Sequence, residues 1–134
     1  MKTLLWIWQL PQNLLGRFIV AICDARKTTY MFIGSHDIYI ANRFRGGWGV
    51  SLGDYIIFGY NKPTLQSKSH EYGHQIQSRR LGWFYLIIIG IPSVLGNRWD
   101  KIMHKNWSYE EREEWYYKKL PWERNADKLG NVGR

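Results

Sequence analysis

The sequence predicts a single α+β domain in which a small antiparallel sheet precedes a long helix and a helical C-terminal part. The chain has 134 residues, which is enough for one domain with a modest core. Short strand-like runs separated by turn residues occupy residues 28–62. Helical spacing of apolar residues and capping residues mark residues 63–82 and 107–130. We therefore expect one domain over residues 1–134.

The β region contains two expected hairpins. Gly34, Ser35 and His36 supply the turn of the first, and Gly53 and Asp54 supply the turn of the second. Because each hairpin pairs neighbouring strands in opposite directions, the expected sheet is antiparallel. The strands are predicted at residues 30–33, 37–40, 48–52 and 55–60.

Two apolar runs lie on either side of the β region and the long helix. Residues 1–27 form an apolar N-terminal arm, and residues 83–96 form a second apolar segment. Pro11 and Pro92 interrupt these runs, and neither run fits a simple membrane span of about 20 residues. We expect two short helices joined near Pro11, and a buried, re-entrant or interfacial helix in the second run. The runs together favour membrane association; the alternative for the arm is a buried packing element of a soluble fold.

The composition also points to a membrane surface. The chain has 19 Lys and Arg against 11 Asp and Glu, a formal net charge of +8, and 16% of its residues are aromatic. Such a balance suits nucleic acid or an anionic membrane, and no nucleic-acid module signature is present, so no nucleic-acid partner is expected. The basic character favours a membrane-associated protein with a cytoplasmic site. The single Cys23 excludes an internal disulfide and a Cys-rich zinc site.

The C-terminal part has clear helix signals. Residues 97–106 are expected to form a polar, basic connector. Ser108 and Glu111 form a capping box at the start of the next helix. Pro121 ends that helix and begins another, for which Gly130 is the expected C-terminal cap.

The long helix carries a His-Glu-x-x-His motif. His70 and His74 are four residues apart, so their imidazoles leave the same face of a helix and can bind one metal ion. Glu71 lies one position further round, where it can deprotonate a water molecule at the metal. Arg79 in the last turn and Gly82 as a C-terminal cap support the helix. The alternative is a surface helix that carries these residues by chance.

Two histidines do not complete a catalytic zinc site, which usually has three protein ligands. The last helix offers Glu123 and Asp127, again four residues apart on one face. His36 and His104 are the other candidates, in segments that resemble a turn and a connector. By residue pattern alone, an exposed acidic helix face beside Arg124 and Lys128 is the better explanation of this pair.

A resemblance distinguishes these candidates. A His-Glu-x-x-His helix followed by Glu-x-x-Ala-Asp, here residues 123–127, resembles the gluzincin metallopeptidases, especially the CAAX-prenyl-protease-like group. This resemblance implies a minimal zincin-like fold, Glu123 as the third zinc ligand and Asp127 as an acidic residue that orients a metal-binding histidine. The whole chain also resembles small bacterial proteins with matching stretches at residues 7–16, 70–82 and 126–130.

The expected function is that of a zinc metallopeptidase acting on peptide or protein substrates at a membrane. Zn²⁺ is expected on His70, His74 and Glu123, with Glu71 as the general base. The predicted strand at residues 48–52 is an expected edge strand for pairing with an extended peptide.

Two other functions compete with the peptidase. The first is a non-catalytic domain in which zinc stabilises the fold, against which Glu71 argues. The second is a basic adaptor for membranes or nucleic acid in which the histidines are incidental. Manganese, cobalt or iron(II) would suit similar ligands, although zinc is the expected metal.

Overall fold

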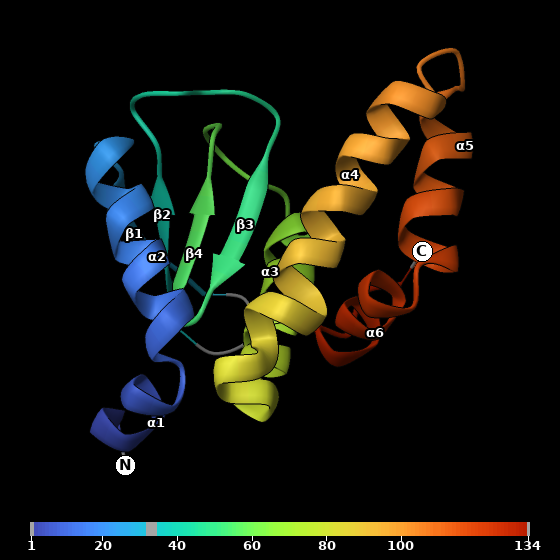
Figure 1. Cartoon of the computed structure of the whole chain (residues 1–134). Helices are drawn as coiled ribbons and strands as arrows, with labels where there is room; N and C mark the ends of the chain where they lie inside the picture. The colour runs from blue at the N-terminus through green and yellow to red at the C-terminus, as the bar shows by residue number, and fades with distance from the viewer. Residues whose placement is uncertain (1, 32–34, 134) are drawn as a thin grey trace.

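The computed structural model describes residues 2–31 and 35–133. These residues form an α+β domain with a four-stranded sheet beside six α-helices (Figure 1). The strands are β1 (Arg26–Met31), β2 (Ser35–Ile40), β3 (Gly49–Leu52) and β4 (Tyr55–Phe58). The α-helices are α1 (Lys2–Trp8), α2 (Leu10–Ile22), α3 (Leu65–Leu81), α4 (Ile91–Met103), α5 (Tyr109–Glu113) and α6 (Pro121–Leu129). A 3₁₀ turn, η1 (Gly82–Phe84), and two π-helical segments, η2 (Leu86–Gly90) and η3 (Glu114–Lys119), complete the helical part.

The sheet is mixed, so the prediction of a wholly antiparallel sheet is wrong. Its strand order is β1-β2-β4-β3, and β2 runs parallel to β4. The loop over residues 41–48 carries the chain past the position of β4 before β3 begins. The tight turn at Gly53, where φ is +63°, then returns β4 into the gap between β3 and β2. Glycine suits this turn because it adopts positive φ without a steric penalty.

Both predicted hairpin pairings are present, with shifted boundaries. Strand β1 begins at Arg26, four residues earlier than predicted, because it pairs along the full length of β2. Ser35 and His36 belong to β2 rather than to the expected turn. Residues 32–33 of the predicted strand and Gly34 of the predicted turn lie outside the described residues.

Helix α2 packs on the sheet with a polar face. Gln12, Asn13 and Gly16 are buried, and a Cβ at Gly16 would lie 2.9 Å from the Tyr55 side chain. Asn13 Oδ1 accepts a hydrogen bond from the Asp54 backbone N–H at 2.7 Å. Buried amides of this kind are stable only when they are hydrogen-bonded. The apolar face of α2 therefore points away from the sheet, opposite to what a buried packing element requires.

The N-terminal arm forms two helices joined close to Pro11, as predicted: α1 ends at Trp8, and Pro11 lies in the first turn of α2. The second apolar segment differs from its prediction. Pro92 does not break it: the π-helical segment η2 ends at Gly90, α4 begins at Ile91, and the backbone stays helical through both. Helix α4 continues to Met103 through most of the predicted connector, because apolar residues recur at helical spacing there.

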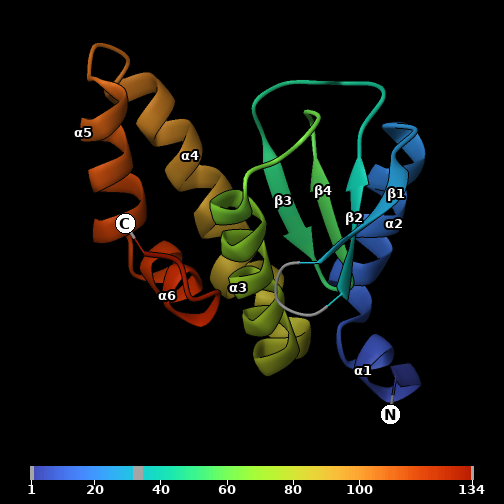
Figure 2. The ribbon, with the colours of Figure 1, turned by 180° about the vertical axis from the view of Figure 1, so that it is seen from behind.

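Among the described residues, no helix has both the length and the apolarity to cross a membrane. In Figure 1, α2 and the segment from η2 to α4 face the viewer. Figure 2, from behind, shows the sheet in front of α2, and α3 in front of the beginning of that segment. The two apolar segments therefore lie on the same side of the molecule, and α3 lies on the other.

Helices α4 and α5 are joined by a buried carboxylate. Asp100 accepts hydrogen bonds from Arg112 Nε at 3.0 Å and Nη2 at 2.8 Å, and its other oxygen lies 3.0 Å from His104 Nδ1. Burial alone would raise the pKa of Asp100, but Arg112 and His104 outweigh burial and lower it. His104, an alternative third ligand by sequence, stacks on Trp107 and belongs to this cluster.

We expect Asp100→Asn to lower the free energy of unfolding at pH 7 by about 1–3 kcal/mol, because it removes charged hydrogen bonds from a buried site. The pKa of Asp100 is lower in the folded state, so its ionised form stabilises the fold above about pH 4, and this contribution disappears as the pH falls further. Urea unfolding at pH 7 and pH 3 measures the free energy of unfolding of both proteins. The difference between Asp100→Asn and wild type should be smaller at pH 3 than at pH 7. An unchanged difference would contradict a role for the charge; Glu110→Gln, at an exposed carboxylate, is the control.

Candidate metal centre

The metal-binding motif lies in the middle of α3. This helix begins after Thr64, whose hydroxyl accepts a hydrogen bond from the Ser67 backbone N–H at 3.1 Å. It ends at Gly82, where φ is +55°. His70 and His74 are both buried, and their ring centroids lie 4.7 Å apart. The predicted helix and the shared face of its histidines are confirmed.

Two glycines allow α6 to approach α3 closely. A Cβ at Gly73 would lie only 1.8 Å from the backbone oxygen of Ala126. A Cβ at Gly130 would lie 1.9 Å from the backbone oxygen of Ser69. Any larger residue at these positions would force the two backbones apart. This contact explains why Glu123, on α6, is completely buried against the histidines of α3.

Three side chains converge at this contact. Glu123 Oε2 lies 3.0 Å from Nε2 of His70 and 3.0 Å from Nε2 of His74. One ligand atom from each residue lies within 4.8 Å of the others, and all three residues are buried. Two imidazole nitrogens and one carboxylate oxygen form a donor set that zinc accepts in catalytic sites. The three residues named by the sequence are therefore brought together and could hold a metal ion.

The outer nitrogens of both imidazoles are also held. His70 Nδ1 donates to Asp127 Oδ1 at 2.6 Å, and His74 Nδ1 donates to Gln77 Oε1 at 2.7 Å. The amide nitrogen of Gln77 donates to the Trp122 carbonyl, which fixes its oxygen toward His74. Each Nε2 is thus left facing Glu123, as metal-binding imidazoles require.

Asp127 lies where the resemblance places it, beside His70. The role of Gln77 was not predicted, although the sequence contains its signal. It follows His74 by three residues and therefore lies on the same helix face.

The second oxygen of Glu123 is fixed by two hydroxyls. Oε1 accepts a short hydrogen bond from Ser93 of α4 and another from Tyr116 of η3 at 3.1 Å. Neither contact was predicted. Tyr117 packs edge-on against His70, with ring centroids 5.0 Å apart. The fixed Oε1 leaves Oε2 to face the histidines.

The electrostatics of this cluster favour an ionised carboxylate. Burial alone would raise the pKa of Glu123, but the neighbouring His74 and His70 outweigh burial and hold it well below the usual range. Burial alone would lower the pKa of His70, but hydrogen bonds with Asp127 and Glu123 outweigh burial and raise it to about 9. Without metal, the site is therefore an ion pair between imidazolium and carboxylate.

Glu71 lies between α3 and the sheet edge. A Cβ at Gly49 would lie 3.2 Å from Glu71 Oε1, so the glycine leaves room for this carboxylate beside β3. Burial raises the pKa of Glu71, although His74 and His70 act in the opposite direction. Tyr85, another unpredicted residue, is buried nearby and donates a hydrogen bond to the Ser51 carbonyl of β3 at 2.9 Å.

Strand β3 is an edge strand among the described residues, since it pairs only with β4. Trp48 O accepts a hydrogen bond from Gly59 N at 2.9 Å, and Gly49 is the next residue along. Because backbone groups alternate in direction along a strand, the N–H and C=O of Gly49 point away from β4. The free edge of the sheet therefore passes beside Glu71.

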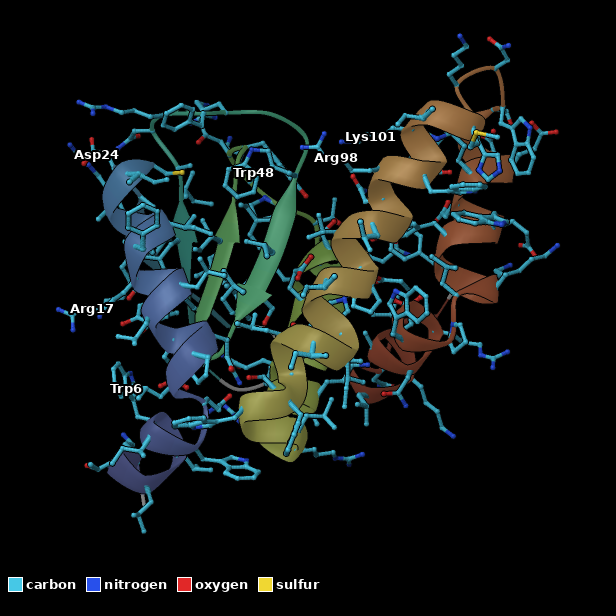
Figure 3. The ribbon with its side chains drawn as sticks, viewed as in Figure 1. Trp6, Arg17, Asp24, Trp48, Arg98 and Lys101 are labelled. Carbon is cyan, nitrogen blue, oxygen red and sulfur yellow. The ribbon has the colours of Figure 1, made fainter. Side chains whose placement is uncertain are left out.

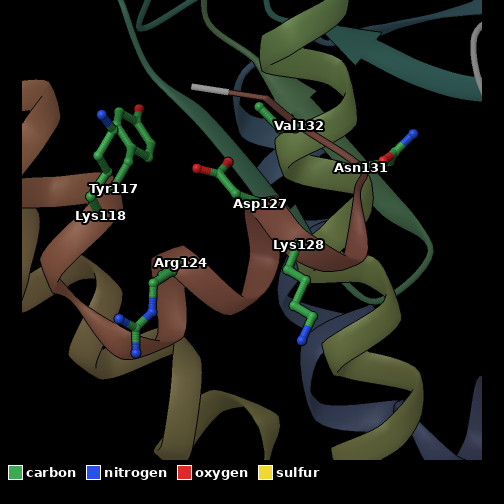
Figure 4. A pocket seen from close by; sticks show the side chains of 7 residues that line it. All are labelled: Tyr117, Lys118, Arg124, Asp127, Lys128, Asn131 and Val132. Carbon is green, nitrogen blue, oxygen red and sulfur yellow. The ribbon is translucent and has the colours of Figure 1, made fainter.

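An open pocket of about 430 Å³ borders the candidate metal centre at Asp127 (Figure 4). Arg124 and Lys128 extend away from the Asp127 carboxylate in this view. The pocket therefore offers access to Asp127, and its basic side chains do not converge on one point there. Its lining residues are Tyr117, Lys118, Arg124, Asp127, Lys128, Asn131 and Val132.

We expect purified wild type to hold about one zinc ion per chain and Glu123→Ala to bind zinc much more weakly, because the variant lacks one of three donors. Elemental analysis and a competitive chelator titration measure both. Glu114→Ala, on an exposed acidic residue of η3, should keep wild-type affinity. Equal zinc affinity in Glu123→Ala and wild type would exclude Glu123 as a ligand.

Replacing an outer partner should weaken zinc binding without abolishing it. Asp127→Ala and Gln77→Ala each remove a hydrogen bond that orients an imidazole, and we expect a loss of about 10–100-fold in affinity. The same chelator titration measures the change. Wild-type affinity in both variants would show that the outer nitrogens do not contribute.

Comparison with known protein families, curated proteins and solved structures finds no match to this chain. The functional interpretation therefore depends on the geometry of His70, His74 and Glu123 and on the residues that hold them. The role of these three residues as metal ligands stays a prediction.

Proposed function

We propose that the protein is a zinc-dependent metallopeptidase of the gluzincin type with a minimal zincin-like fold. The observation that carries this proposal is the convergence of two imidazole Nε2 atoms on one oxygen of Glu123, with Glu71 next to His70 in the same helix turn. His70, His74 and Glu123 would hold the ion. When bound, zinc supplies a Lewis acid that lowers the pKa of water to about 7 and polarises a carbonyl group.

Glu71 has the properties of a general base for peptide hydrolysis. Burial raises the pKa of its carboxyl toward the working range of a proton-transfer group. Its carboxylate would accept a proton from water during attack on the peptide carbonyl and return it to the leaving amine. Glu71 makes no contact with His70 or His74 that resembles those of Glu123, which leaves it available for this role.

The free edge of β3 suits an extended peptide substrate. Gly49 presents an unpaired backbone N–H and C=O beside Glu71, and a peptide that pairs there gains main-chain hydrogen bonds independent of its side chains. Tyr85 supports this position by holding the Ser51 carbonyl of the same strand. Substrate binding and the general base are thereby brought next to each other.

A structural zinc site is the second candidate function. Glu123 contacts residues from α3, α4 and η3 as well as belonging to α6, so an ion there would join four helical segments. Metal binding would then contribute free energy of folding. A purely structural site, however, gives no reason for a half-buried carboxylate at Glu71 beside a glycine of the sheet edge.

Glu71→Gln separates the two candidates. We expect the variant to keep about one zinc per chain and to lose about 10²–10⁴-fold in peptidase rate, because it cannot accept a proton. The measurement is cleavage of a fluorescence-quenched peptide library by zinc-loaded protein, with Glu110→Gln as the control. A zinc-loaded wild type that cleaves no peptide but unfolds on chelation would support the structural site instead.

A further inference from the structure

The exposed apolar side chains of this protein are concentrated in two segments. Nearly all of those in the described residues belong to α1 and α2 or to the run from η1 to α4. The exceptions among large apolar side chains are Phe44, Leu65, Trp107 and Tyr109. Exposed apolar patches of such extent mark an interaction surface.

The run from η1 to α4 presents one continuous apolar stripe. Phe84, Ile87, Ile91, Leu95 and Ile102 recur at intervals of three, four or seven residues, and each is more than half exposed. Residues at these intervals share one face of a helix. The opposite face packs inward, where Ser93 reaches Glu123 and Asp100 is buried.

Helix α2 presents a second stripe. Leu14, Phe18 and Ile22 are exposed on the face opposite to the buried Gln12 and Asn13. A surface helix normally directs its apolar face to the core. In α2 the apolar face points to solvent instead, because hydrogen-bonded amides fill the face that packs inward.

The helices that carry the two stripes approach each other at one end, where α1 meets η1 (Figure 1). The Trp83 indole donates a hydrogen bond to the Ile7 carbonyl at 2.8 Å, and the Trp8 indole donates to the Arg79 carbonyl at 2.9 Å. The first contact joins α1 to η1, at the beginning of the η1–α4 run, and the second joins α1 to the last turn of α3. The helices that carry both stripes also lie on the same side of the molecule (Figures 1 and 2). We call the exposed apolar face of α1, α2, η1, η2 and α4 the docking surface.

The charges on the docking surface have one sign. The sequence has no Asp or Glu between residues 2 and 23 or between residues 72 and 99. Arg17 on α2 and Arg98 and Lys101 on α4 are exposed, and Arg17 extends outward from α2 in Figure 3. Long basic side chains can bury their stems in an apolar layer and keep their charges at its polar boundary.

We propose that the docking surface lies in the interfacial layer of a lipid bilayer that contains anionic lipids. Apolar stripes with basic residues and tryptophans, and without acidic ones, match the acyl boundary and the anionic headgroups above it. A second copy of the chain fits less well, because it would bring Arg17 and Arg98 of both copies into one interface without acidic partners. The proposal does not depend on the metal centre.

The test is co-sedimentation of the full chain with vesicles of phosphatidylcholine alone or of phosphatidylcholine with phosphatidylglycerol. We expect binding at least about tenfold tighter to the anionic vesicles, weakened by salt, since each basic residue near the surface contributes about fivefold. Arg17→Gln and Arg98→Gln should each lower binding to the anionic vesicles by about that factor. Equal binding to both vesicle types would overturn the proposed role of the charges.

The apolar contribution is tested with Ile87→Glu and Leu95→Glu. Each places a charge in the middle of the stripe, and we expect each to weaken vesicle binding at least about tenfold. Phe44→Glu and Leu65→Glu change equally exposed apolar residues outside the docking surface and should bind like wild type. Circular dichroism checks that all variants are folded.

Two further results would overturn the proposal. One is a folded wild type that binds neither vesicle. The other is a wild type that binds no vesicles and forms a dimer by light scattering, whereas the Ile87→Glu variant is a monomer. This result would show that a second copy of the chain covers the docking surface. Loss of zinc or of peptidase activity would leave the vesicle result unchanged, so the two proposals fail separately.

Discussion

The close backbone contact between α3 and α6 is the constraint on which the candidate site depends. Gly73 and Gly130 have no room for a side chain, because each faces a backbone carbonyl of the other helix. Only at this separation does the short Glu123 side chain reach both imidazoles, and only then does Asp127 reach His70. The positions of the donor atoms thus follow from two glycines that do not themselves bind anything.

Hydrogen bonds among His70, His74, Glu123 and their partners offset the free-energy cost of burying these charged and polar groups. A buried carboxylate is costly unless its oxygens are hydrogen-bonded or paired. Both oxygens of Glu123 have partners, and so do both nitrogens of His70 and His74. Ser93, one of these partners, comes from the inner face of α4, whose outer face carries the apolar stripe. One helix therefore contributes to the interior of the site and to the surface of the molecule.

The sequence predicted the parts of the site that depend on local spacing. Spacing placed His70 and His74 on one helix face and Glu123 and Asp127 on another, and the capping box at Ser108 is present. The resemblance, and not the spacing, selected Glu123 and Asp127 for the site. Spacing cannot show contacts between distant segments, so Ser93 and Tyr85 were missed.

Two features of the fold could not be predicted from the sequence, for the same reason. The parallel pairing of β2 with β4 depends on where a loop carries the chain, which no hairpin pattern records. The apolar face of α2 points outward, whereas apolar residues normally face inward. Its inward face is filled by buried amides, which form hydrogen bonds with Ser78, the Gly82 carbonyl and the Asp54 backbone N–H. These partners come together only in the folded molecule, so the sequence of α2 does not reveal them.

The π-helical segment η3 has a consequence for how this chain can vary. It carries two neighbouring tyrosines that serve the same centre, Tyr116 on the Glu123 carboxylate and Tyr117 against the His70 ring. Single-turn π segments are wider than α-helix and occur frequently at functional sites. Deleting one residue from η3 would rotate the preceding residues by about 100° relative to the following ones and separate these contacts. Related chains should therefore tolerate substitutions in this turn more readily than changes in its length.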